Sequence, residues 1–125
     1  MVYFYNPNPT KSKDANDCVI RAFAFFFGIS WEDAFLDLVK WCISKGLVRF
    51  NYRSVYTQYL LDKGFKKKKA PSKGLTIGDF CANYAHSRKV YIVSLPRHLS
   101  IVFDQDIFDI FDCSNMVMDG YWAKQ

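Results

Sequence analysis

Cys18 is the side chain whose place in the sequence best suits covalent chemistry. It follows Asn16 and Asp17, a pair typical of a helix N-cap, and residues 19–27 are apolar except for Arg21. The thiol is therefore predicted in the first turn of a buried helix. There the helix dipole and unpaired N–H groups lower a thiol pKa from its ordinary value of about 8.5 and favour a nucleophilic thiolate. The alternative is a small apolar residue that only packs.

His98 is the candidate base, and a predicted β-hairpin gives it a carboxylate partner. Residues 98–103 and 107–112 are rich in β-forming side chains and are separated by three residues. In that register His98 faces Asp112 across the strand pair, with Cβ atoms about 4.5–5.5 Å apart. Asp109 has the wrong parity unless a bulge shifts the register by one residue. The alternative is a hairpin whose polar end has no catalytic role.

The three residues together supply the parts needed for acyl transfer through a thioester. Cys18 is the nucleophile, His98 the general base and acid, and Asp112 the acid that fixes the imidazole tautomer. The expected reaction is attack on a peptide or isopeptide carbonyl, so a protein or peptide is the expected substrate.

Residues 17–28, which read DCVIRAFAFFFG, resemble the Cys-helix segment of papain-like cysteine peptidases. The likeness is greatest to the compact bacterial type found as bacteriocin-leader-processing domains of export transporters. Residues 98–102 and Asp112 are similar to the His strand and Asp strand of that fold, and small proteins of bacteria and bacterial viruses share the Asp-Cys-x-x-Arg-Ala pattern. The resemblance implies one papain-like thiol protease domain over residues 1–125, with N-terminal helices and a central Cys-bearing helix packed on a C-terminal antiparallel sheet.

The oxyanion hole departs from the family pattern. Papain-like peptidases usually carry a Gln several residues before the cysteine, whereas Ser12 stands at that place here. Asn16 is the nearest amide and is expected to donate to the oxyanion together with the Cys18 backbone N–H, a contribution of about 2.7–4 kcal/mol. Asn16 acting only as an N-cap is the alternative. The missing Gln favours a second hypothesis, a non-catalytic papain-like interaction or inhibitor protein that binds a host or partner protein.

Other chemistry-bearing side chains are assigned less active roles. His86 is expected on the surface at a helix end, and Cys113 is expected to pack on the opposite strand face from Asp112. Trp122 is expected to anchor the C-terminal segment to the sheet, although an aromatic ring over His98 would also fit. A zinc ion on the three candidate residues lacks a fourth ligand, so neither a metal nor a cofactor is expected.

Periodicity and capping signals supply the elements that hold these residues. Helices are expected first and strands later, which indicates an α+β fold. Residues 1–15 are expected to form an extended arm and loop. Helices are predicted over 18–27, 31–45, 53–63 and from 77 to about 86–89, and strands over 89–95, 98–103 and 107–111.

Composition and charge narrow the function classes. Half of the 125 residues are hydrophobic and 18% are aromatic, which excludes disorder and predicts one compact domain. The net charge of +5 is concentrated in a lysine run over residues 63–73, which is expected to be a solvated loop. Nucleic-acid binding through Lys66 to Lys69 is a third hypothesis. It is disfavoured because no aromatic residue alternates with the lysines.

The cysteine spacing and the apolar segments bear on the expected location of the protein in the cell. Neither a zinc motif nor a disulfide framework matches their spacing, and the first residues lack the charged and apolar regions of a secretory signal. No apolar run approaches the roughly 20 residues of a membrane helix. A cytoplasmic location without a membrane partner is therefore expected, with reduced thiols at Cys18, Cys42, Cys81 and Cys113.

Overall fold

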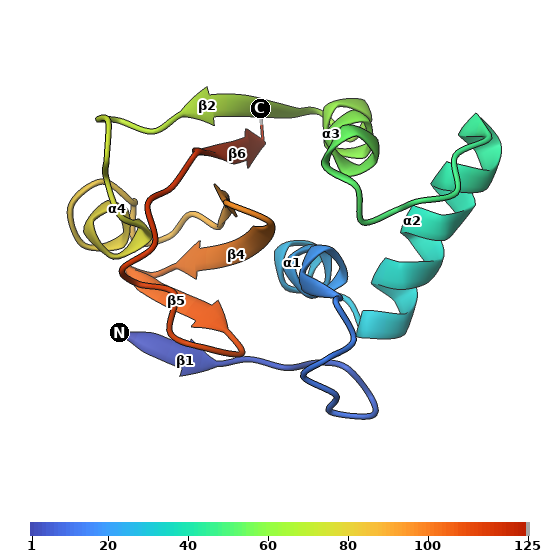
Figure 1. Cartoon of the computed structure of the whole chain (residues 1–125), viewed down its shortest axis with the longest axis horizontal. Coiled ribbons are helices and arrows are strands. Elements are labelled where there is room, and N and C mark those ends of the chain that lie inside the picture. The colour runs from blue at the N-terminus through green and yellow to red at the C-terminus, as the bar shows by residue number, and fades with distance from the viewer. Residues whose placement is uncertain (125) are drawn as a thin grey trace.

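The computed structural model describes residues 1–124, which form four helices and one mixed six-stranded sheet (Figure 1). The strand order is β1-β5-β4-β3-β6-β2. The predicted α+β class is confirmed. The strands are β1 (Val2–Phe4), β2 (Phe65–Lys69), β3 (Tyr91–Leu95), β4 (His98–Phe103), β5 (Asp106–Asp109) and β6 (Gly120–Lys124).

The expected C-terminal strands are antiparallel, but the sheet has an additional parallel strand at one edge. β1 pairs in parallel with β5, with Val2 opposite Ile107, whereas the other neighbours are antiparallel. β1 belongs to the segment predicted as an extended arm. Three residues are too few to show the alternation that identifies a strand, so its pairing was not visible in the sequence.

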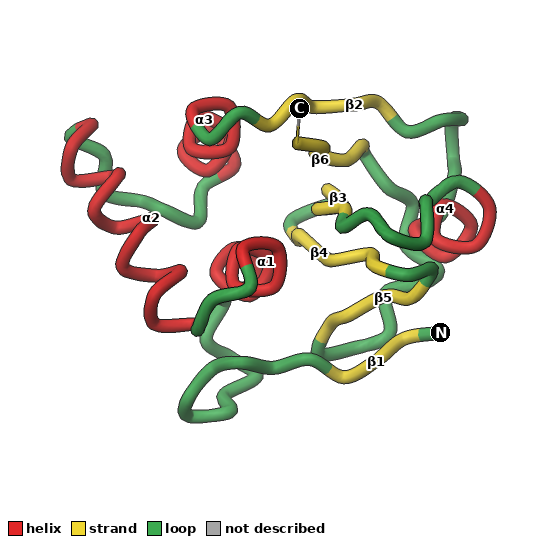
Figure 2. The backbone as a smooth tube through the Cα atoms, turned by 180° about the vertical axis from the view of Figure 1, so that it is seen from behind, coloured by secondary structure: helices red, strands yellow, loops and turns green. Residues whose placement is uncertain are grey.

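The helices cover both faces of the sheet. In Figure 1 the sheet stands between α4 on one side and α1 and α3 on the other, with α2 outside α1. Figures 1 and 2 both show α1 beside β4, a packing that the contacts between the two elements confirm. The helices are α1 (Cys18–Phe27), α2 (Trp31–Lys45), α3 (Arg53–Asp62) and α4 (Ile77–Asn83).

α1 is buried on several sides because it lies between the sheet and the other helices. Its buried residues include Ile20 and Phe23, and the Phe23 ring stacks on Tyr59 of α3 with centroids 4.8 Å apart. The helix ends at Gly28, whose φ of 64° is left-handed and whose N–H bonds back to the last turn. The sequence-predicted limits of α1 are therefore confirmed.

The predicted caps of two further helices are also present. The Ser30 hydroxyl accepts the Asp33 N–H at the start of α2, and the Thr76 hydroxyl accepts the Asp79 N–H at the start of α4. α4 ends at Asn83, several residues before its predicted end, and His86 lies exposed beyond it.

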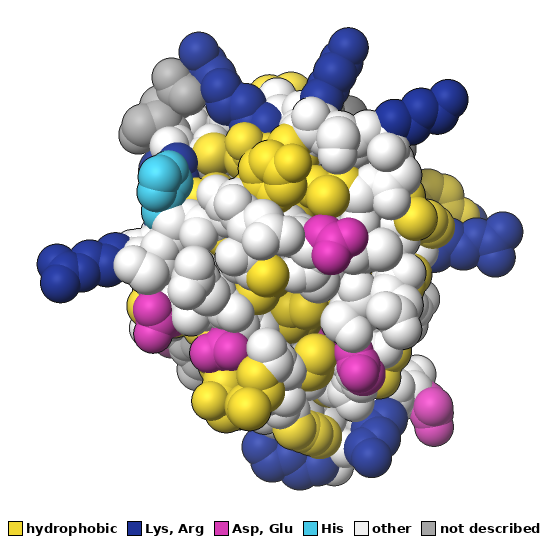
Figure 3. Space-filling model, turned by 90° about the vertical axis from the view of Figure 1, so that its left-hand side faces the viewer, with side chains coloured by type: hydrophobic (Ala, Val, Ile, Leu, Met, Phe, Trp, Pro, Cys, Tyr) yellow, Lys and Arg dark blue, Asp and Glu magenta, His cyan; other side chains and the backbone are white. Residues whose placement is uncertain are grey.

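The lysine run forms an edge strand, so the prediction of a solvated loop is wrong. β2 pairs antiparallel with β6, and its first residue, Phe65, is buried. The four lysines that follow are exposed, and the Lys67 ammonium lies 5.4 Å from the Trp122 ring centroid. Lysine is common on edge strands, because its charge disfavours pairing of the edge with another chain. In Figure 3 basic side chains project along the upper edge of the molecule, where Figure 1 places β2.

Candidate active site

Cys18 opens α1 at the end of the sheet where β4 begins and β5 ends. Asp17 is the N-cap residue of α1 by position, but its side chain makes no capping hydrogen bond. Its carboxylate instead accepts hydrogen bonds from Trp31 Nε1 at 2.8 Å and Asn8 Nδ2 at 3.1 Å, and it pairs with Arg21. No side chain at the cap therefore competes for the first N–H groups of α1, and the helix dipole acts on the thiol.

The His98 ring lies between the thiol and a carboxylate. Cys18 and His98 line the same hollow, and interactions with the His98 side chain and the Leu99 backbone N–H lower the pKa of the thiol. His98 Nε2 is 2.6 Å from Asp109 Oδ2, which leaves Nδ1 for the sulfur. The Phe111 ring packs against the imidazole with centroids 5.1 Å apart, and the His98 side chain is 11% exposed. The thiol, the imidazole and the carboxylate thus lie next to one another, with a hydrogen bond between the last two.

The carboxylate in this chain is Asp109, and the expectation that Asp112 faces His98 is wrong. Asp112 is exposed beyond the end of β5, where its Oδ1 accepts hydrogen bonds from the Ser114 N–H at 2.9 Å and the Ser114 hydroxyl at 2.6 Å. It holds a local turn and does not reach His98.

The length of the β4–β5 turn explains the difference. Phe103 pairs with Asp106, so the loop holds two residues rather than the predicted three. Both loop residues, Asp104 and Gln105, have left-handed φ values of 52° and 62°, as a type I′ turn requires. The register therefore differs by one residue from the predicted one, and this reverses the parity of every later side chain.

The corrected register places Asp109 opposite Ser100 and on the same side of the strand pair as His98. Asp109 Oδ2 accepts the Ser100 hydroxyl at 2.6 Å, and Asp109 is 3% exposed. Its other oxygen accepts the Ile110 N–H at 2.7 Å and lies 3.6 Å from Arg21. Both carboxylate oxygens are therefore held in place.

Arg21 connects α1 to the end of β5. One guanidinium nitrogen pairs with Asp17 one turn earlier in the same helix, and the other approaches Asp109. All three side chains are almost fully buried. Sequence reasoning missed the roles of Arg21 and Asp109, although a single charged residue inside an otherwise apolar helix is a signal that a buried partner exists.

Burial and hydrogen bonding shift the pKa values of this chain in complementary directions. Burial raises the pKa of Cys18, but the hydrogen bonds from His98 and Leu99 and the charges of His98 and Arg21 outweigh it, so the pKa is lowered. Burial lowers the pKa of His98, but the hydrogen bonds with Asp109 and Cys18 outweigh it and raise the pKa to about 9. These directions favour transfer of the thiol proton to the imidazole.

The other cysteines have no such environment. Burial raises the pKa of the Cys42 thiol. It also raises the pKa of Cys81 to about 11 and that of Cys113 to about 12. Their predicted packing role is confirmed, because all three are buried in the core. Cys113 packs against the candidate site, with its thiol 3.5 Å from Asp109 Oδ2.

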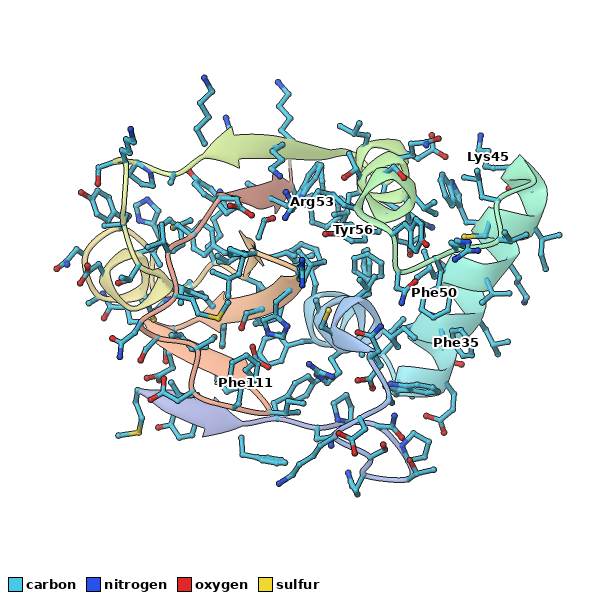
Figure 4. The ribbon with its side chains drawn as sticks, in the orientation of Figure 1. Phe35, Lys45, Phe50, Arg53, Tyr56 and Phe111 are labelled. Carbon is cyan, nitrogen blue, oxygen red and sulfur yellow. The ribbon has the colours of Figure 1, made fainter. Side chains whose placement is uncertain are left out.

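Two surface hollows meet at Cys18. The larger cleft, of about 680 Å³, is lined by residues of α3 and the loop before it, and the smaller, of about 230 Å³, includes His98 and Phe111. In Figure 4 Arg53 and Tyr56 lie above the start of α1 and Phe111 lies below it. Three residues line both hollows: Asn16, Cys18 and Arg97.

Asn16 is exposed at the junction of these hollows and is not the N-cap residue, which is Asp17. Its φ of 53° is left-handed, a conformation that asparagine adopts more readily than most residues. The expected anchor, Trp122, is buried in β6 opposite Ile92 of β3, and the aromatic ring beside His98 is Phe111.

Comparisons with protein-family models, with curated proteins and with solved structures find no match to this chain. Within residues 1–124 no group of three or more His, Cys, Asp or Glu side chains is arranged to hold a metal ion. Over the same residues, no helix combines the length and apolar character needed to cross a membrane. Function is therefore inferred from the side chains around Cys18.

Proposed function

We propose that this protein is a papain-like cysteine peptidase that cleaves a peptide or isopeptide bond. The observation that carries the proposal is Cys18 beside His98, which is hydrogen-bonded to Asp109, at an open cleft. A nucleophile, a base and a carboxylate that orients the base are the parts of a thiol acyl-transfer site. Asp109 takes the role that the sequence assigned to Asp112.

The first half of the reaction forms a thioester. The Cys18 thiolate attacks the carbonyl carbon and gives a tetrahedral oxyanion. The His98 imidazolium then donates its Nδ1 proton to the leaving nitrogen, and the C–N bond breaks. Asp109 accepts the Nε2–H throughout, which keeps Nδ1 directed at the reacting atoms.

The second half hydrolyses the thioester. Neutral His98 takes a proton from water while the water oxygen attacks the acyl carbon. Collapse of this second oxyanion breaks the C–S bond, releases the carboxylic acid and restores the thiolate–imidazolium pair. The Cys18 backbone N–H and the Asn16 amide, which lines both hollows, are the proposed oxyanion donors.

Alkylation by iodoacetamide at pH 6 tests the activated thiol, with each cysteine followed by mass spectrometry. We expect Cys18 to react first and about tenfold or more faster than in a His98→Ala variant, because each unit of pKa depression raises the thiolate fraction tenfold. Asp112→Asn is the matched control and should react like the unchanged protein. Equal Cys18 rates with and without His98 would contradict the proposal.

Cleavage of a mixed peptide digest tests the reaction itself. The unchanged protein should produce new peptide termini that Cys18→Ala does not produce. The alternative function is that of a non-catalytic interaction protein. In that case the Cys18→Ala variant keeps its full biological effect and its partner binding. That result would overturn the proposal.

A further inference from the structure

Arg97 is an exposed cation at the candidate site. It precedes His98 directly and lines both hollows that meet at Cys18. Among residues 1–124, no carboxylate oxygen lies within 4.0 Å of its guanidinium. Its charge is therefore available to a ligand in either hollow.

The larger cleft has no acidic side chain to offset this charge. Two arginines and no Asp or Glu line it. The second arginine, Arg53 of α3, is already paired with Asp119 at 2.9 Å and donates to the Leu95 carbonyl at 3.3 Å. Arg53 thus ties α3 to the turn that carries Arg97, and the unpaired guanidinium is that of Arg97.

The backbone at Arg97 is left-handed, as it is at four other non-glycine positions among residues 1–124. Leu95 pairs with His98, so Pro96 and Arg97 form a two-residue turn between β3 and β4. The φ of Arg97 is 56°, a left-handed value at the turn position where glycine or asparagine is preferred. Non-glycine residues in such conformations cluster at functional sites, where the strain is retained for what the side chain does.

We propose that Arg97 is a specificity residue that selects substrates with a carboxylate side chain next to the scissile bond. This proposal rests on the peptidase function proposed above. Guanidinium binds carboxylate through two parallel hydrogen bonds, so it selects for geometry as well as for charge. The substrate class is therefore an acidic peptide, which the net positive charge of the protein also attracts.

The reactivity of Cys18 toward iodoacetate and iodoacetamide is the first test, because these reagents differ mainly in charge. The iodoacetate to iodoacetamide rate ratio should fall about two- to fivefold in Arg97→Gly, the size expected when one exposed ion pair is removed. Arg88→Gly is the matched control, since Arg88 is also exposed and lies on the loop between α4 and β3. An unchanged ratio in Arg97→Gly, or an equal fall in both variants, would overturn the proposal.

A pair of peptidyl vinyl sulfones that differ only in Glu or Gln beside the electrophile is the second test. The unchanged protein should react faster with the Glu compound than with the Gln compound, and Arg97→Gly should lose this preference. Arg97→Glu should instead react fastest with a third compound that carries Lys at the same position. Glycine suits the left-handed turn, so Arg97→Gly should melt no lower than the unchanged protein. A Glu preference that survives Arg97→Glu would overturn the proposal.

The two proposals fail in different ways. If Cys18 is not activated, iodoacetamide alone reacts slowly in every variant and the peptidase function fails. If Cys18 is activated but the charge preference does not depend on Arg97, only the specificity proposal fails.

Discussion

Asp109 is bound more firmly than a carboxylate that only carries charge would need to be. His98 and Ser100 donate to one oxygen, and Ile110 and Arg21 hold the other. A carboxylate fixed in this way cannot rotate, so the imidazole it binds keeps one tautomer and one orientation. Ser100 and Arg21 are positioning residues by this reasoning.

The substitution Asp109→Asn should lower the free energy of unfolding and slow the reaction of the Cys18 thiol. It removes one of the two carboxylates that compensate buried Arg21, the other being Asp17, and breaking a buried ion pair from one side costs up to about 3–5 kcal/mol of unfolding free energy. Urea denaturation measures this loss, and iodoacetamide alkylation at pH 6 measures the accompanying slower reaction of Cys18. Asp112→Asn should change neither quantity. A larger effect at Asp112 than at Asp109 would contradict the assignment.

The pH dependence of peptide cleavage should have two limbs. In the proposed mechanism kcat/KM requires the Cys18 thiolate and the His98 imidazolium. It should rise with pH as Cys18 loses its proton, below the ordinary thiol pKa of about 8.5, and fall as His98 loses its proton near pH 9. A profile of kcat/KM from pH 4 to 10 measures both limbs.

Removal of the imidazole separates the two groups. In His98→Ala the Cys18 thiolate loses the interaction with the imidazole and its positive charge while burial still raises the pKa, so alkylation should rise only at or above the ordinary thiol pKa. The iodoacetamide rate measured against pH shows this shift. A Cys18 titration that is the same in both proteins would mean that the helix terminus and not His98 sets the thiol pKa.

At the scale of elements, the β4–β5 turn decides which carboxylate meets the histidine. Its two residues, Asp104 and Gln105, adopt left-handed conformations that cost most side chains about 1–2 kcal/mol each, while glycine adopts them freely. Gln105→Gly should therefore raise the free energy of unfolding by about 1 kcal/mol. The midpoint of urea denaturation measures this gain in stability, provided that the dependence of the unfolding free energy on urea concentration is unchanged. A lower midpoint would contradict the turn assignment.

The same turn shows why sequence reasoning predicted part of the site. Local signals were sufficient for the helices: Ser30 and Thr76 cap their helices, Gly28 ends α1, and Cys18 begins it. His98 was also identified correctly as the first residue of its strand. The register was not, because Asp-Gln lacks the glycine that usually marks a two-residue hairpin loop.

Pairing between distant strands was the other part that the sequence did not reveal. β2 is a lysine run with little β propensity and no alternation, and it is a strand because β6 pairs with it. β1 is too short to show a pattern. Both lie at sheet edges, where the neighbour rather than the local sequence determines the structure.

At the scale of the whole molecule, the pairing of β2 with β6 forms one edge of the sheet. A Cβ placed on Gly120 would clash with the Lys68 carbonyl oxygen, so this strand pair requires glycine. Gly120→Ala should destabilise the protein by about 1–3 kcal/mol, as overpacking does. Urea denaturation measures the loss, and hydrogen exchange should show faster exchange in β2 and β6. Unchanged exchange there would contradict the close approach.

The site joins the two ends of the chain, because Arg21 binds Asp17 of its own helix and Asp109 of a strand formed much later in the sequence. Contacts between such distant segments are the slow ones to form in folding. During synthesis Cys18 therefore leaves the ribosome long before its base and carboxylate exist. The nascent chain carries an ordinary thiol, and any reactivity toward other proteins begins only when the finished sheet closes against α1.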